Sequence, residues 1–260
     1  MPSTYVSFQA INRNLSSSLA STAAEPAVAN QTQYYLANIG KVKSIDDFLG
    51  NYKLFSYAMK AYGLGDMSYA KGLMRQVLEG GIDDPQSPAN KLTDPRYKAF
   101  ATAFNFVANG DATTSGTAAS SGTVSQYVQQ TLEERAGDQN QGVRLALYFQ
   151  RLAPGVTSAY GLLADPALLS VVQTALGIPA ASSAQDVDIQ ARSIASRLNI
   201  AELQDPAELQ AFIGRFTALY DAGNAASAPP ANAALLIGQG LTGISSDLLQ
   251  SLQGLKLGGT

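Results

Sequence analysis

Apolar residues recur at intervals of three and four along most of the chain, and this spacing constrains the fold more than any other feature. The clearest run follows Ser44, an expected N-cap, and ends at Gly63, an expected helix stop. Its apolar members are Phe48, Tyr52, Phe55, Met59 and Tyr62. Side chains at this spacing share one face of a helix, whereas strand-like alternation is scarce here. The sequence therefore predicts an all-α protein, with one long amphipathic helix after Ser44 and another over 67–80.

Asp-Pro pairs mark further helix starts. Asp accepts hydrogen bonds from first-turn amides, and Pro is tolerated at the first helical position because its missing N–H needs no partner there. The pairs are Asp84-Pro85, Asp94-Pro95, Asp165-Pro166 and Asp205-Pro206. A helical apolar pattern follows the last three, so we predict helices there and a turn at Asp84-Pro85.

The two halves of the chain resemble each other. Leu54 to Leu64 parallels Leu168 to Ile178, and each run is followed by a second helical pattern and a Leu-x-Asp-Pro start. We interpret this as two related helical units that pack into a bundle. The alternative is chance similarity between amphipathic helices.

Three stretches rich in small and polar residues are predicted to be linkers: Ala20 to Gln31, Asp111 to Gly122, and Ala222 to Asn232. The domain organisation then predicted is an N-terminal helical segment (1–40), two helical units (44–110 and 123–222) and a C-terminal amphipathic helix (232–260).

The composition excludes most catalytic chemistry. The chain has no Cys, His or Trp, so thiol nucleophiles, histidine bases and ordinary zinc sites are excluded. The acidic pairs Asp46-Asp47 and Asp83-Asp84 are expected at helix or turn starts, and Glu133-Glu134 on a polar face. The segment Glu133 to Arg144 is predicted to be a polar junction between helices, with a partner-contacting loop as the alternative. We therefore expect no catalytic residues, no metal and no cofactor; a carboxylate-dependent enzyme is the less favoured alternative.

Charge and hydropathy exclude other partners. The 17 basic and 20 acidic residues give a net charge of −3, and no Lys/Arg block forms. A nucleic-acid binder or a polybasic membrane anchor would need such a block. No apolar run reaches about 18 residues, so no membrane insertion is expected. The N-terminus lacks the features of a Sec signal peptide.

Both ends of the chain carry apolar stripes of the kind that form a seam between helices. The N-terminal stripe is Phe8, Ile11, Leu15 and Leu19, and the C-terminal stripe is Leu241, Ile244, Leu248, Leu252 and Leu255. We predict that these residues form an assembly interface. The alternative is that both ends fold onto the chain's own core.

Several runs resemble a known family: Asn51 to Leu64, Asp94 to Phe100 with Phe104 to Phe106, Gln129 to Phe149, and Ala164 to Gly177. Over residues 44 to 220 the chain is similar to an uncharacterised alphaproteobacterial family, catalogued as a domain of unknown function and commonly encoded among flagellar genes. The family brings no catalytic residues.

The resemblance implies a flagellar context. We expect a non-enzymatic structural component, axial or axial-associated, that is exported without a Sec signal and assembles with itself or with other flagellar proteins. Familiar rod and hook proteins place strands in their outer domains, and this sequence departs from that pattern. The alternative is a cytosolic flagellar assembly factor or export chaperone.

Overall fold

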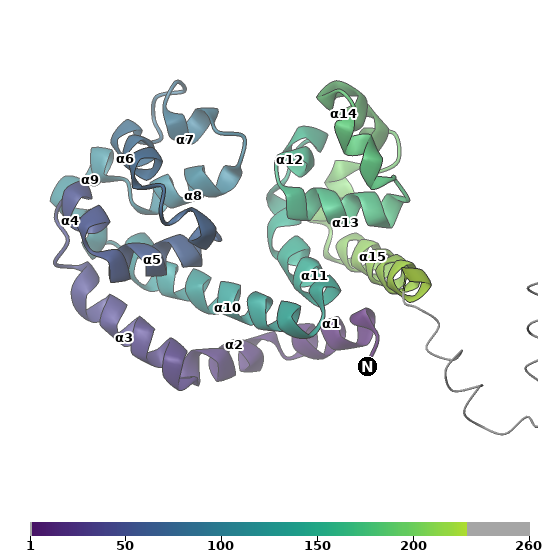
Figure 1. Ribbon diagram of the computed structural model, residues 1–260, viewed down its shortest axis with the longest axis horizontal. Helices are drawn as coiled ribbons and strands as arrows, with labels where there is room; N and C mark the ends of the chain where they lie inside the picture. The colour runs from purple at the N-terminus through teal and green to yellow at the C-terminus, as the bar shows by residue number, and fades with distance from the viewer. Residues whose placement is uncertain (1, 228–260) are drawn as a thin grey trace, which may run out of the picture. The chain divides into compact units, whose positions relative to one another are not determined.

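The computed structural model describes residues 2–227, in which no strand occurs, and confirms the all-α prediction (Figure 1). The helices are α1 (Thr4–Arg13), α2 (Leu15–Ala24), α3 (Pro26–Ile39), α4 (Ile45–Gly50), α5 (Tyr52–Ala61), α6 (Lys71–Gly80), α7 (Pro88–Lys91), α8 (Pro95–Ala103), α9 (Phe106–Asn109), α10 (Thr123–Gln139), α11 (Gln141–Leu152), α12 (Ala159–Leu163), α13 (Pro166–Leu176), α14 (Val187–Ala195) and α15 (Pro206–Ser227). A compact unit ends at Asp221, within α15, and the contacts described below belong to it.

This unit contains two hydrophobic cores joined by α10. The first core is built mainly from α3 to α9, and the second from α1 and α11 to α15. Helix α10 contributes Tyr127 and Val128 to the first core and Ala136 to the second. It contacts α2 and α5 along its length and α11 at its end (Figure 1). One helix therefore connects the two cores through buried side chains.

The internal repeat has a counterpart in local structure. The turn that ends α5 contains Gly63 with φ 70°, and the Leu64 N–H donates to the carbonyl of Met59 at 2.8 Å. Helix α13 ends at Gly177 with φ 63°, and the Ile178 N–H reaches back five residues in the same way, also at 2.8 Å. Glycine suits both positions because a Cβ disfavours positive φ. The matched sequences thus encode the same kind of helix ending.

The long helix expected after Ser44 is two helices. Ser44 caps α4 as predicted, its hydroxyl accepting from the Asp47 N–H at 3.0 Å. Asn51 then accepts from the Leu54 N–H through its side chain and starts α5. This side-chain bond replaces the helical continuation and turns Tyr52 outward, so that it is 63% exposed. The second predicted helix likewise begins later than 67, at Lys71, after a 3₁₀ turn at Gly65–Met67.

The Asp-Pro predictions are confirmed. Asp94, Asp165 and Asp205 accept from first-turn amides of α8, α13 and α15. Each of these helices begins at the proline that follows its aspartate. Asp84 instead closes a turn, accepting from the Gln86 N–H at 2.8 Å.

The linker predictions for the first two segments are wrong. Residues 20–31 are helical apart from the short break at Glu25, where α2 gives way to α3. Residues 111–122 lie mostly in a 3₁₀ segment (Gly110–Ser115) and a π-helical turn (Ala118–Gly122). In the third segment, residues 222–227 belong to α15, and 228–232 lie outside the described residues.

Small residues at 111–122 allow close packing on the first core. The Thr114 hydroxyl donates to the carbonyl of Val42 at 2.7 Å, and the Tyr35 hydroxyl donates to the carbonyl of Ala119 at 2.5 Å. Both bonds are buried, and Ala119 has no exposed surface. Residues 111–122 therefore have the composition of a linker, but buried hydrogen bonds hold them against the first core.

Thr114→Val tests this packing. Valine keeps the shape but leaves the buried Val42 carbonyl without its donor, so we expect the free energy of unfolding to fall by about 1–3 kcal/mol. Urea denaturation would measure the change. The control is Thr102→Val, whose exposed hydroxyl donates only to Lys98 one turn back in the same helix. Equal changes in the two variants would show that 111–122 contributes no buried bond of consequence.

Candidate binding site

A groove of about 540 Å³ lies between α3, α5 and α10. Its volume is in the range of ligand sites. Helix α3 supplies Asn30, Gln31 and Tyr34, helix α5 supplies Tyr52, Lys53, Ser56, Tyr57 and Lys60, and helix α10 supplies Tyr127. The groove is therefore lined by tyrosine rings, lysines and neutral polar groups, with no carboxylate among them.

Two of the lining rings, Tyr57 and Tyr127, belong to a stack of tyrosines. The ring of Tyr57 lies 4.3 Å from that of Tyr35 and 3.9 Å from that of Tyr127, between centroids, and the planes are within 20° of parallel. The Tyr57 hydroxyl hydrogen-bonds with Thr32 at 2.9 Å, and the Tyr127 hydroxyl donates to Gln31. Burial raises the pKa of Tyr57 and of Tyr127 above the usual value. Both phenols therefore stay neutral and act as fixed ring surfaces.

The rim carries charge and exposed rings. Lys53 Nζ lies 5.0 Å from the ring centroid of Tyr34, which is 38% exposed. Lys60 Nζ lies 5.3 Å from the ring of Tyr127 and 2.8 Å from Glu134 Oε2. Among the ion pairs of the described residues, Lys53 takes part in none. The groove thus presents two lysines beside aromatic rings: Lys60, which is paired with a carboxylate, and Lys53, which is not.

Ser56 differs from its neighbours at the groove. Its Oγ is buried and has no hydrogen-bond partner, the one such side-chain atom in the part of the chain that the structure describes. Buried polar atoms are paired in the great majority of cases, so an unpaired hydroxyl at a cavity wall is a feature that a ligand could satisfy.

A second polar cluster centres on Glu133, which the sequence placed on a polar face. That assignment is wrong: Glu133 has no exposed surface, and its two carboxylate oxygens each accept from Arg151 at 2.7 Å. Gln129 donates to the same carboxylate at 3.0 Å. The guanidinium of Arg151 also lies 5.2 Å from the ring of Tyr148 on the same helix. The pair between Arg151 and Glu133 ties α11 to α10.

The junction predicted over Glu133 to Arg144 is correspondingly short. Helix α10 continues to Gln139, and Asn140 alone separates it from α11. The Asn140 side chain caps α11 by accepting from the Gly142 N–H at 2.8 Å. Glu133 lies inside α10 and is buried there. The sequence did not show this, because a buried ion pair interrupts the apolar spacing that marks the covered face of a helix.

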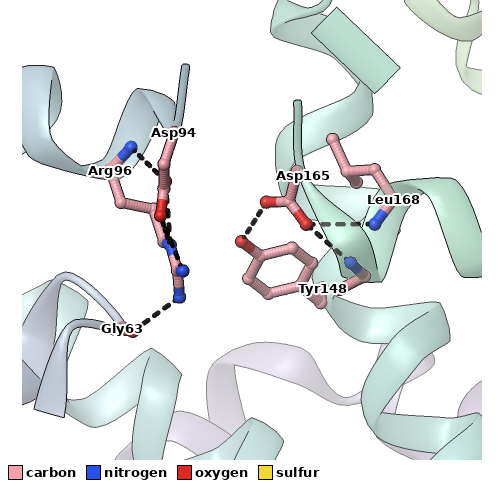
Figure 2. Close-up of polar contacts among 7 residues, drawn as sticks. Gly63, Asp94, Arg96, Tyr148, Asp165 and Leu168 are labelled. Atoms are coloured by element: carbon pink, nitrogen blue, oxygen red, sulfur yellow. Dashed lines mark hydrogen bonds and ion pairs between the residues drawn. The ribbon is translucent and has the colours of Figure 1, made fainter. Parts of the chain in front are cut away.

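Figure 2 shows two helix-capping aspartates from the two halves, with the polar side chains around them. Asp165 caps α13 and accepts from the Tyr148 hydroxyl at 2.6 Å. Asp94 caps α8 and pairs with Arg96, whose Nη1 donates to the carbonyl of Gly63 at 2.7 Å. The hydrogen bond from Asp94 raises the pKa of Arg96, and the charge of Asp165 adds to the effect. Asp94 is paired with Arg96, and Asp165 is hydrogen-bonded to Tyr148 and to first-turn amides of α13, so both aspartates position helix starts.

The N-terminal stripe packs on the chain's own cores. Phe8 is fully buried in the second core with Ile11 against it, Leu19 packs against the first core, and Leu15 is half-buried between. This is the alternative that the sequence left open. The physical reason is that α1 to α3 extend past both cores, so their apolar face finds partners within the same chain. The C-terminal stripe, Leu241 to Leu255, lies outside the described residues.

Hydrogen bonds also hold the start of α1. The backbone N–H of Thr4 donates to Asp221 at 2.9 Å, and its hydroxyl donates to the same carboxylate. Asn140 donates to the Thr4 hydroxyl at 2.8 Å. The buried Thr4 therefore links α1 to α15 and to the start of α11.

Residues 2–227 contain no group of three or more acidic side chains arranged to hold a metal ion. None of their helices combines the length and apolar character that a membrane crossing requires.

Comparison with known proteins gives a family and a fold relative. Residues 61–209 match the family described as "Protein of unknown function (DUF1217)". An Agrobacterium tumefaciens protein of known crystal structure shares 44% sequence identity with this chain. The two structures superpose with a TM-score of 0.80 over 86% of this chain and 97% of that one. No curated protein matches the chain. The predicted resemblance to a domain of unknown function with an alphaproteobacterial member is therefore confirmed. Of the groove residues, only Tyr127 lies inside the matched range 61–209.

Proposed function

Because this chain belongs to the DUF1217 family, for which no function is known, we propose from its geometry that it is a non-enzymatic flagellar assembly factor that binds a partner through the tyrosine–lysine groove. The flagellar part of the proposal rests on the resemblance to a family commonly encoded among flagellar genes. The binding part rests on the groove, which offers rings, amides and a free cation.

One observation favours an assembly factor over an axial subunit. Phe8 is fully buried in the chain's own core, and Thr4 is bonded to Asp221 and Asn140. An axial protein that pairs its terminal helices on assembly would instead keep the apolar stripe of its N-terminal helix available in the free chain. The second candidate, an axial or axial-associated subunit, is favoured by the apolar stripe Leu241 to Leu255, which remains a prediction from sequence.

A deletion strain tests both candidates. We expect loss of swimming in soft agar, with rescue by the wild-type gene, because an assembly factor is needed to build the filament. In the rescued strain, we expect the protein in the cytosolic fraction and not in purified hook–basal bodies or sheared filaments. Recovery with the purified axial structure would identify an axial subunit. Normal swimming and normal filaments in the deletion strain would contradict the flagellar role.

A further inference from the structure

We infer that the groove between α3, α5 and α10 recognises an acidic peptide segment of a partner protein, with a carboxylate at Lys53 and Ser56 and a neighbouring aromatic side chain on the exposed tyrosines. This inference rests on the proposed function only in taking the groove as a protein-binding surface. It holds equally for a partner outside the flagellum.

Hydrogen-bond donors follow one another along α5 at the groove. Lys53, Ser56 and Lys60 follow one another at intervals of three and four, so they share one face of the helix and span about 10 Å at 1.5 Å per residue. Lys60 already has a carboxylate partner in Glu134. The donors left without a partner are therefore the Lys53 ammonium and the Ser56 hydroxyl, whose Oγ is buried in the free protein and must turn toward the groove to reach a ligand.

Two such donors at neighbouring positions suit a carboxylate. Its oxygens can accept from an ammonium and a hydroxyl at once, and hydrogen bonds in which a partner is ionised are the stronger kind. No carboxylate lines the groove to compete with an incoming anion. Charge complementarity therefore favours an acidic residue over a basic or neutral one.

Exposed tyrosine rings line the groove beside these donors. Tyr52 and Tyr34 are 63% and 38% exposed, and Lys53 lies over the Tyr34 ring. Tyrosine is enriched at protein interfaces because its ring buries a large apolar area at low entropic cost. A side chain next to the bound acid would stack on these rings.

The remaining lining residues fit a peptide backbone. Gln31 uses its Oε1 as the acceptor for Tyr127, which leaves its amide nitrogen to donate to a peptide carbonyl. Asn30, one residue earlier at the groove edge, offers both a donor and an acceptor. A groove with such exposed rings is better matched by a protein segment than by a metabolite, since small-ligand sites bury most of the ligand surface.

The experiment uses the full chain, labelled with ¹⁵N, and the peptide acetyl-Asp-Trp-Asp-amide. Amide chemical shifts report binding into the millimolar range, and tryptophan fluorescence of the peptide gives a second signal because the chain has no Trp. We expect shifts confined to the groove segments of α3, α5 and α10. The matched peptide acetyl-Asn-Trp-Asn-amide should bind about tenfold more weakly, since it lacks the charge-assisted bonds.

Variants assign the contacts. Lys53→Glu should weaken binding of the acidic peptide by about tenfold or more, because it replaces attraction with repulsion. Lys98→Glu is the matched control, an exposed lysine on α8 away from the groove, and should leave binding unchanged. Ser56→Ala should weaken binding while leaving the melting temperature unchanged or higher, because it removes a hydroxyl with no partner in the free protein.

The same titrations can overturn the inference. It fails if millimolar acidic peptide shifts no groove amide, if both peptides bind equally, or if Lys98→Glu weakens binding as much as Lys53→Glu. It also fails if AMP or maltotriose shifts the groove amides and the acidic peptide does not. Peptide binding together with normal motility of the deletion strain would refute the flagellar proposal and leave this inference standing.

Discussion

Phe8→Ala is expected to lower the free energy of unfolding by about 3–5 kcal/mol, because it removes a fully buried ring and leaves a cavity. Phe8 is the contribution of α1 to the second core, whose other members come from α10 to α15 and the turns between them. Loss of the ring also weakens the attachment of α1, so its amides should exchange with deuterium faster. Urea denaturation and hydrogen exchange would measure the two effects.

Val6→Ala is the control on the same helix. Val6 is 57% exposed, and its truncation should change stability by no more than about 0.5 kcal/mol. If Phe8→Ala were equally mild and α1 amides exchanged freely in the wild-type monomer, the N-terminal stripe would be available for assembly. The axial subunit would then become the favoured function.

Glu133→Leu is expected to destabilise the protein by a similar amount, about 3–5 kcal/mol, because it leaves the Arg151 guanidinium without its carboxylate. Arg151 is only partly accessible to water and cannot lose its charge. Thermal and urea unfolding would measure the loss. Since the pair joins α10 to α11, the junction between the two cores should loosen first.

Two further variants separate the ion pair from general effects of the substitution. Glu134→Leu removes a carboxylate that is 34% exposed and paired with Lys60, and should cost no more than about 1 kcal/mol. The double variant Glu133→Leu with Arg151→Met should recover much of the lost stability, since replacing a buried pair by apolar groups is often neutral. A double variant as unstable as Glu133→Leu alone would show that the pair is not the cause.

The groove between α3, α5 and α10 was not visible in the sequence. Its residues come from three separate places, 30–34, 52–60 and 127. The first begins in a segment predicted to be a linker, and the other two lie in segments predicted to be helical. Tyr52 even fits the apolar face of the helix predicted after Ser44. Only the break at Asn51 turns it outward, and only the packing of α3 and α10 on α5 brings the tyrosines and lysines together.

The sequence by itself determined the features that depend on a few neighbouring residues. The all-α class follows from apolar spacing. The helix starts at Ser44, Asp94 and Asp165 follow from side chains that accept from amides two or three positions ahead, and the ends at Gly63 and Gly177 follow from positive φ. Such contacts close within one helical turn, so the local sequence contains both partners.

The tertiary structure alone decided which surfaces are covered. It buried Phe8 and Glu133, and it ordered residues 111–122 by bonds to Tyr35 and Val42, far away in the chain. Apolar spacing shows that a helix has a face to bury, but the partner of that face is set by packing between distant segments. For that reason the sequence predicted the helices, while the distinction between an assembly seam, a linker and a core required the fold.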